Sequence, residues 1–207
     1  MRATYAGHDI VLCMDHELNE AVRILKRGGV IALPTETTYG LACDPRKRAA
    51  VQKIFNIKGR DENKPLQLIA SSISQVTSLA KLSGKSKELA TAYWPGPLTL
   101  LLPLKKGKRL APEVCPYKTI GIRVTSSVIA KKLVRAYGHP LAATSANRSG
   151  RVPAFSDTEV QEAFKRFKFK PDFVMHGGHI PKGKPSTVAL ALDDGSVIVI
   201  RKGSIKL

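Results

Sequence analysis

The chain has 207 residues, 43% of them apolar, so it can bury a core and is not an intrinsically disordered protein. Its 34 lysines and arginines against 16 acidic residues give a net charge of +18, which predicts attraction to polyanions such as nucleotide phosphates or RNA. The longest uncharged apolar run, Leu98–Leu104, is far shorter than the roughly 20 residues of a transmembrane helix, so no membrane association is expected.

The cysteines predict a reducing compartment. Cys13, Cys43 and Cys115 are odd in number and widely spaced, which excludes a disulfide framework and a zinc ribbon. We therefore expect free thiols and a cytoplasmic protein.

Hydrophobic periodicity and turn residues predict alternating helices and strands. In chain order the elements are a helix over 17–27, a strand over 30–33, a helix over 49–57, a strand over 67–70, a helix over 87–94, strands over 98–104 and 119–124, a helix over 128–137, a strand over 141–144, a helix that follows Ser156 and ends in the basic run 165–170, and strands over 173–175, 187–192 and 197–201. Because some strands alternate with helices and others follow as hairpins, we predict an α/β fold of mixed α+β character. We expect a single domain over residues 1–207, with a twisted, open, mixed parallel and antiparallel sheet and helices on both faces.

Two glycine- and histidine-containing motifs do not predict sites. Gly178–Lys184 has the spacing of a Walker loop, but Pro185 occupies the Ser/Thr position and a predicted strand follows where a helix should begin. His176 and His179 have no third ligand nearby and are interpreted as turn residues, so no metal site is predicted.

Three polar segments adjoin predicted strands, where open α/β sheets bind their ligands. Pro34–Leu41 carries hydrogen-bonding side chains, Lys58–Leu66 carries three cations, and Thr144–Gly150 carries hydroxyls, an amide and a cation. The alternative for each segment is a polar loop that serves only as a turn.

The spacing Lys58-x-Arg60 followed by Ser145-x-Asn147 resembles the KxR…SxN signature of the YrdC-type family, the threonylcarbamoyl-adenylate synthases of tRNA modification. The resemblance covers nearly the whole chain. Its further segments are 34–41, 64–66, 94–99, 121–124, 177–178, 185–188 and 201–203. The intact signature argues against a paralogous branch of the family in which it is altered.

The resemblance implies a YrdC-like twisted mixed sheet around a positively charged concave site. Family members combine L-threonine, bicarbonate and ATP, with Mg²⁺, to give threonylcarbamoyl-adenylate and pyrophosphate. The product would pass to a tRNA threonylcarbamoyl transferase complex that modifies adenosine 37. This transfer needs positioning and charge neutralisation rather than a protein nucleophile.

The resemblance also implies roles for individual residues. Lys58, Arg60, Ser145 and Asn147 would be the catalytic set. The residues implied at the nucleotide are Arg60, Lys64, Thr119, Ser145, Pro153 and Arg201. Those implied at threonine are Thr35, Thr37, Arg123, Ala143 and Ser186, with Arg123 a natural bidentate partner for a carboxylate.

Two features depart from the longer or commoner family pattern. Ile69 stands where several members carry a histidine, which leaves the amino-acid specificity open. The sequence ends at Leu207, and we expect the short form without an extra C-terminal domain. The alternative function is a non-catalytic protein that binds double-stranded RNA or tRNA on the same basic surface.

Overall fold

The computed structural model describes the backbone of residues 3–207 and the side chains of residues 15–207, so the thiol of Cys13 lies outside the described residues. Its helices are α1 (Ala3–Lys26), α2 (Arg48–Lys58), α3 (Ile73–Leu79), α4 (Gly84–Tyr93), η1 (Pro116–Lys118), α5 (Val128–Tyr137) and α6 (Asp157–Phe164). Its strands are β1 (Ile31–Pro34), β2 (Tyr39–Cys43), β3 (Gln67–Ala70), β4 (Leu98–Pro103), β5 (Thr119–Val124), β6 (Leu141–Ser145), β7 (Phe173–Val174), β8 (Thr187–Ala191) and β9 (Val197–Arg201).

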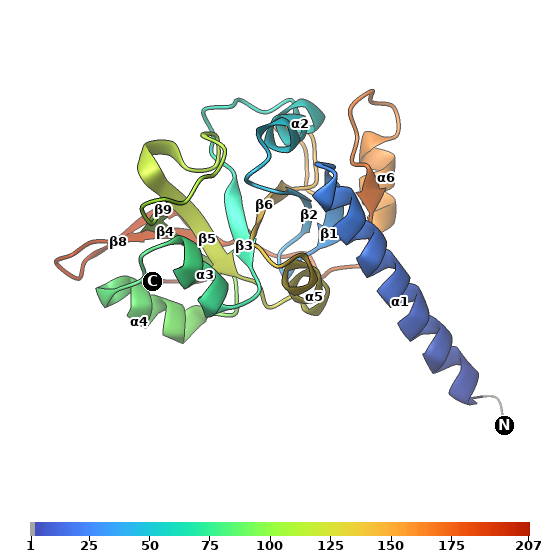
Figure 1. Cartoon of the computed structure of the whole chain (residues 1–207), viewed down its shortest axis with the longest axis horizontal. Helices are drawn as coiled ribbons and strands as arrows, with labels where there is room; N and C mark the ends of the chain where they lie inside the picture. Colours follow the sequence, from blue (N-terminus) through green and yellow to red (C-terminus); the bar gives the residue numbers. More distant parts are fainter. Residues whose placement is uncertain (1–2) are drawn as a thin grey trace.

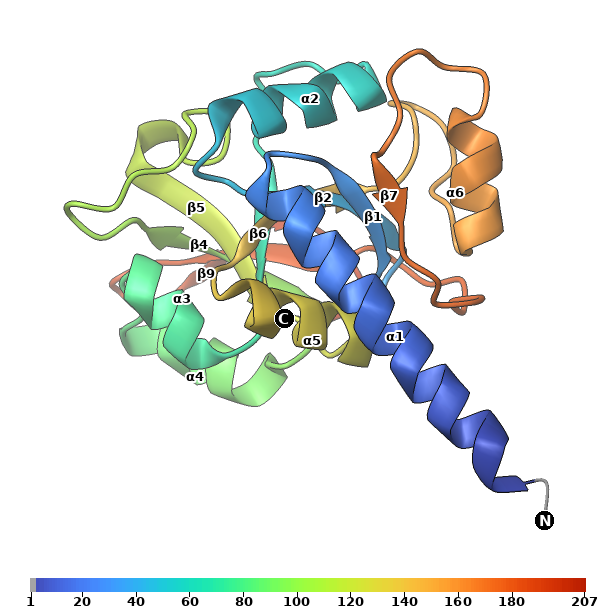
Figure 2. The same ribbon diagram turned by 45° about the vertical axis from the view of Figure 1, so that its right-hand side comes forward.

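These strands form one nine-stranded sheet in the order β7-β1-β2-β6-β3-β5-β4-β8-β9 (Figure 1). The pairs β7–β1, β3–β5 and β4–β8 are parallel, whereas the other five pairs are antiparallel. The predicted mixed sheet is therefore confirmed. Figure 2 shows α1 and α5 lying against each other beside the sheet, with α2 on the opposite side.

Alternate residues of β1 divide the core into two clusters. Ile31 and Leu33 pack with α1 and α5, while Ala32 packs with the cluster that includes buried residues of α2, α3, α4 and α6. This alternation is the period-two pattern of a strand covered on both faces. The expectation of helices on both faces is thus confirmed.

The structure differs from the predicted elements at several places. The first helix, expected over 17–27, begins at Ala3, and the short helix η1 was not predicted. β2 is absent from the prediction because Tyr39–Cys43 contains small residues of low strand propensity, yet β1 and β6 pair with it on either side. α3 was also missed, although the Ser72 hydroxyl accepts a hydrogen bond from the Gln75 amide and caps it. The last helix ends at Phe164, so the basic run 165–170 follows it rather than belonging to it.

Asp44 is a buried carboxylate that contacts Arg46 and Tyr137. Its carboxylate accepts hydrogen bonds from Nε and Nη2 of Arg46 at 2.9 and 2.8 Å and from the Tyr137 hydroxyl at 2.6 Å. Burial raises the pKa of Asp44, but these hydrogen bonds lower it more, so the pKa lies below its usual value.

Replacing Asp44 with asparagine is expected to lower the free energy of unfolding by about 2 kcal/mol at pH 7. Because the folded pKa lies below the unfolded one, the carboxylate stabilises the protein above the ordinary pKa of 3.8, and this is lost as the pH falls through the folded pKa. Urea titrations of both proteins at pH 7 and pH 2 measure the effect. The difference in free energy of unfolding between wild type and Asp44→Asn should shrink at pH 2. An equal difference at both pH values would contradict a stabilising role of the ionised carboxylate.

Candidate functional site

A cavity of about 380 Å³ lies at the middle of the sheet and joins all three polar segments. Its floor is formed by alternate residues of the central strands, Ala143 and Ser145 of β6, Gln67 and Ile69 of β3, and Arg123 of β5. Its walls are formed by the β1–β2 loop, the segments around Arg60 and Pro153, the segment that precedes β8, and the end of β9. The further lining residues are Thr35, Thr37, Thr38, Gly40, Pro65, Thr144, Val152, Phe155, Gly183, Pro185, Ser186 and Arg201.

Three guanidinium groups converge on this cavity, from Arg60, Arg123 and Arg201. Burial lowers the pKa of Arg60. Partial burial lowers the pKa of Arg201, and the nearby charges of Arg123 and Arg60 lower it further. Among the lining residues that the structure describes there is no carboxylate, so the cavity is built for a ligand with several negative charges.

The β1–β2 loop is a tight polar turn held by Thr35. The Thr35 hydroxyl donates to the carbonyl of Thr38 at 2.7 Å and accepts from the amides of Thr37 and Thr38 at 3.3 Å. Its oxygen also lies 3.1 Å from the Thr37 hydroxyl. The turn therefore fixes two hydroxyls at the cavity wall and leaves Glu36 at its tip.

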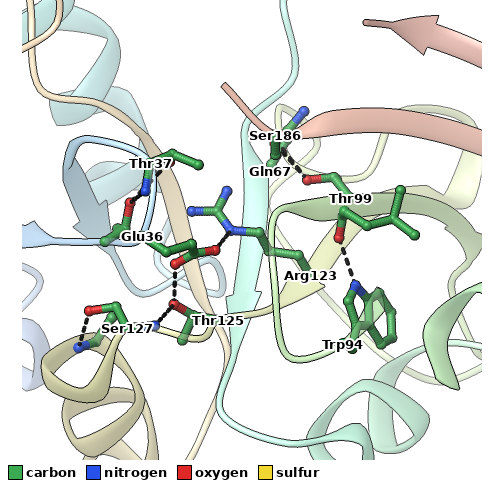
Figure 3. Close-up of polar contacts among 12 residues, drawn as sticks. Glu36, Thr37, Gln67, Trp94, Thr99, Arg123, Thr125, Ser127 and Ser186 are labelled. Atoms are coloured by element: carbon green, nitrogen blue, oxygen red, sulfur yellow. Dashed lines mark hydrogen bonds and ion pairs between the residues drawn. The ribbon is translucent and has the colours of Figure 1, made fainter. Parts of the chain in front are cut away.

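Arg123 points from β5 toward this loop (Figure 3). Its Nε donates to Oε1 of Glu36 at 2.9 Å, and the Thr125 hydroxyl donates to Oε2 of Glu36 at 2.5 Å. The ion pair is almost buried, with exposed fractions of 10% and 11% for the two side chains. The carboxylate thus fixes the direction of the guanidinium.

Arg201 is oriented in a similar way on the opposite wall, although by neutral groups. Its Nε and Nη2 donate to the carbonyl of Ser186 at 3.1 and 2.9 Å, and Nη2 also donates to the Ser186 hydroxyl at 2.8 Å. The same hydroxyl lies 3.0 Å from that of Thr99 on β4. Arg201 therefore keeps its full positive charge available to a ligand.

Lys58 lies beneath the cavity and binds the loop that follows β6. Its ammonium donates to the carbonyls of Ser145 and Asn147 at 2.6 and 2.9 Å and to Oδ1 of Asn147 at 2.9 Å. Burial lowers the pKa of Lys58 to about 7, and the charge of Arg60 adds to the effect. The three oxygens provide one acceptor for each proton of the charged amine, and so Lys58 holds the loop in place.

Asn147 completes this loop from within. Its Oδ1 accepts from the Ser145 hydroxyl at 2.6 Å as well as from Lys58, and its amide nitrogen donates to the carbonyl of Arg151. Arg148 fastens the same loop to the end of α2 through the carbonyls of Asn56 and Ile57. Every polar atom of the Asn147 side chain is therefore used inside the protein.

Arg60 is directed by the backbone of the segment that follows it. Its Nε donates to the carbonyl of Lys64 at 3.1 Å, and Nη2 lies 3.5 Å from the carbonyl of Pro65. The Lys64 side chain is exposed and does not line the cavity. In this structure Lys64 supports Arg60 through its main chain.

The structure brings most of the residues named from the sequence into one cavity. Nine of them line it, namely Thr35, Thr37, Arg60, Arg123, Ala143, Ser145, Pro153, Ser186 and Arg201. Four do not, namely Lys58, Lys64, Thr119 and Asn147. Direct contact of these four with a substrate stays a prediction.

Sequence reasoning did not single out Glu36, whose carboxylate pairs with Arg123. One signal was present, because a lone carboxylate inside a polar segment of a strongly basic chain needs a cationic partner. Gln67 was missed because it lies one strand away from Arg123 in space but 56 positions away in sequence.

The structure describes neither a metal cluster nor a membrane span. Within residues 15–207, no three His, Cys, Asp or Glu side chains come together as metal ligands. Nδ1 of His176 instead lies 2.6 Å from Oδ2 of Asp157. None of the described helices is both long and apolar enough to cross a bilayer.

Comparison with known proteins gives consistent matches. The family model Sua5_yciO_yrdC, described as telomere recombination, matches residues 23–203. A protein of Nitrosococcus oceani named threonylcarbamoyl-AMP synthase is 40% identical over 158 residues, which are 73% of this chain and 82% of the relative. A Bacillus subtilis protein of the same name is 36% identical over 193 residues, 92% of this chain and 54% of the relative.

A solved structure shares the fold as well. P. abyssi Sua5 complexed with L-threonine has a TM-score of 0.80 and 34% identity, over 90% of this chain and 54% of that chain. The chain thus spans about half the length of the P. abyssi and B. subtilis proteins, but most of the length of the N. oceani protein.

Proposed function

Since the chain belongs to the Sua5/YciO/YrdC family, we propose that it synthesises L-threonylcarbamoyladenylate from L-threonine, bicarbonate and ATP. The observation that carries the proposal is the convergence of Arg60, Arg123 and Arg201 on one cavity, with no carboxylate among the lining residues of the described part of the chain. The curated relatives named threonylcarbamoyl-AMP synthase support the same chemistry. In this proposal the chain is an enzyme of the nucleotidyltransferase class.

The amino acid would bind at the β1–β2 loop. Arg123 presents two Nη groups there, and these match the two oxygens of a carboxylate. Thr35 and Thr37 add hydroxyls beside it, and Ile69 and Ala143 form an apolar floor. The complex of P. abyssi Sua5 with L-threonine supports threonine as the amino acid.

The triphosphate would bind between Arg60 and Arg201, with the Ser145 hydroxyl at its side. Two guanidinium groups neutralise the charge that grows on the leaving pyrophosphate. Mg²⁺ would arrive on the nucleotide, because the lining residues within 15–207 offer no carboxylate to hold it and Mg²⁺ readily keeps phosphate and water ligands.

The reaction needs no protein nucleophile. The neutral amine of threonine takes up bicarbonate to give a carbamate and water, and a carbamate oxygen then attacks the α-phosphorus of ATP. The P–O bond to the pyrophosphate breaks as the new bond forms. The protein aligns the two substrates and stabilises charge. The unstable product would pass to a transferase complex that modifies adenosine 37 of tRNA, in the cytoplasm.

Purified protein with ATP, Mg²⁺, ¹³C-bicarbonate and one amino acid at a time is expected to form labelled adenylate and pyrophosphate only with L-threonine. Mass spectrometry of the product measures this. An adenylate of another amino acid would keep the chemistry and change the substrate. Folded protein that forms no adenylate but binds double-stranded RNA would favour the RNA-binding alternative.

The variant Ser145→Ala separates the two functions. It removes one hydroxyl from the cavity and no positive charge, so synthesis should fall while RNA affinity stays within about 2-fold of wild type. Loss of RNA affinity with unchanged synthesis would contradict the placement of Ser145 in an active site.

A further inference from the structure

Glu36 is a nearly buried carboxylate whose two oxygens are both occupied. Oε1 accepts from Nε of Arg123, and Oε2 accepts from the hydroxyl of Thr125 (Figure 3). Glu36 does not itself line the cavity. The cavity-lining side chain that its carboxylate contacts is Arg123.

The contact with Glu36 uses the Nε group of Arg123 and leaves the Nη1/Nη2 end of the guanidinium free to bind a ligand. Neither Nη atom of Arg123 has a hydrogen-bond partner among residues 15–207 that the structure describes, and the arginine lines the cavity. With Nε held by Glu36, the Nη1/Nη2 end is the face left for a carboxylate, and that end binds both oxygens at once. Glu36 thus selects which edge of the arginine meets the substrate.

Glu36 is in turn fixed by a chain of contacts that reaches α5. The Thr125 hydroxyl that donates to Glu36 accepts from the amide of Ser127 at 3.2 Å. The Ser127 hydroxyl donates to the carbonyl of Pro34 at 3.0 Å and caps α5 by accepting from Ala130. The support of Arg123 is therefore tied to both the β1–β2 loop and the start of a helix.

Charge and orientation predict opposite effects of Glu36. As a negative charge beside Arg123, it lowers the positive potential and should weaken the binding of an anion. As an anchor for Nε, it saves the free energy of ordering a flexible arginine and should strengthen binding. We propose that the second effect dominates and that Glu36 is a positioning residue that orients Arg123 to receive the carboxylate of the amino-acid substrate. The inference rests on the proposed function, which supplies that substrate.

Two substitutions at Glu36 distinguish orientation from charge. Glu36→Ala removes the anchor, and L-threonine should bind about 10- to 100-fold more weakly. Glu36→Gln removes the charge but keeps an amide oxygen that can accept from Nε of Arg123, while its NH2 group can donate to the hydroxyl oxygen of Thr125. Threonine affinity should therefore stay within about 3-fold of wild type. Isothermal titration with L-threonine alone measures both. The KM for ATP should change less than about 2-fold in either variant.

Asp44→Asn is the matched control, since Asp44 also holds an arginine but lies outside the cavity lining. It should lower stability and leave threonine affinity unchanged. Thr125→Val removes the hydroxyl that donates to Oε2 of Glu36, and it should weaken threonine binding about 3-fold or more. This second variant tests the proposal even if Glu36→Ala does not fold.

The proposal is overturned if Glu36→Ala or Thr125→Val binds threonine as tightly as wild type does. It is also overturned if Glu36→Gln binds as weakly as Glu36→Ala, because an acceptor for Nε of Arg123 would then fail to restore threonine binding. Wild-type protein that binds no threonine would overturn the proposed function, and this inference with it, whereas wild-type binding with unaffected variants would overturn this inference alone.

Discussion

Replacing Lys58 with methionine is expected to lower kcat/KM for adenylate formation by more than about 100-fold. The ammonium of Lys58 makes three hydrogen bonds to the Ser145–Asn147 loop, and a hydrogen bond to a charged group contributes about 1.5–3 kcal/mol. If losing these hydrogen bonds raises the free energy of the transition state by about 3 kcal/mol, the rate falls by more than 100-fold. The loss would arise from a displaced Ser145, because Lys58 does not line the cavity.

Lys53→Met is the matched control because Lys53 lies on the same helix. It pairs with Asp172 at the surface, 2.6 Å away, and exposed pairs contribute little. Its activity should stay within about 2-fold of wild type. Steady-state rates for both variants, measured where circular dichroism shows them folded, test the prediction. A Lys58→Met enzyme that keeps activity within 10-fold of wild type would contradict the role of Lys58 in holding the loop.

Replacing Gly203 with alanine is expected to destabilise the protein by about 3 kcal/mol and to weaken ATP binding. A Cβ at this position would lie 2.3 Å from the carbonyl oxygen of Pro185, 2.4 Å from the amide nitrogen of Thr187 and 2.5 Å from the carbonyl carbon of Ser186. All three are backbone atoms, so the clash is relieved only by moving the chain. The displaced segment carries Ser186, which orients Arg201 in the cavity.

Gly183→Ala provides the comparison within the same part of the chain. Its added Cβ would approach only the carbonyl oxygen of Pro181, at 4.0 Å, which is ordinary contact. Urea unfolding should leave this variant within about 0.5 kcal/mol of wild type. A Gly203→Ala protein that is as stable as wild type and binds ATP normally would show that the packing of residue 203 against the 185–187 backbone contributes to neither stability nor ATP binding.

The periodic elements were readable from the sequence because their signals are local. The strands 67–70 and 119–124 and the helix 128–137 coincide with β3, β5 and α5, each with strong periodicity and clear end signals. β2 was not readable, since Tyr39–Cys43 becomes a strand through pairing with β1 and β6. One of these partners, β6, lies about a hundred positions away in the chain, so no local pattern signals the pairing.

Most of the residues that line the cavity were predictable, but what each side chain contacts was not. The family resemblance implied Arg60, Arg123, Ser145 and Arg201 as site residues, and all four line one cavity. The resemblance placed Lys58 in the catalytic set, and the structure shows its ammonium bound to the loop after β6. A lysine can bind an anion or hold carbonyl oxygens, and only burial and neighbours decide between them.

By itself, then, the sequence determined the periodic elements, the basic charge and the family resemblance, because these depend on residue type and short spacing. Tertiary structure alone decided which cations line the cavity and which lie outside its lining. It placed Glu36 beside Arg123, 87 positions further along the chain, by bringing the β1–β2 loop next to β5. Such contacts follow from the order of strands in the sheet, which short-range patterns do not encode.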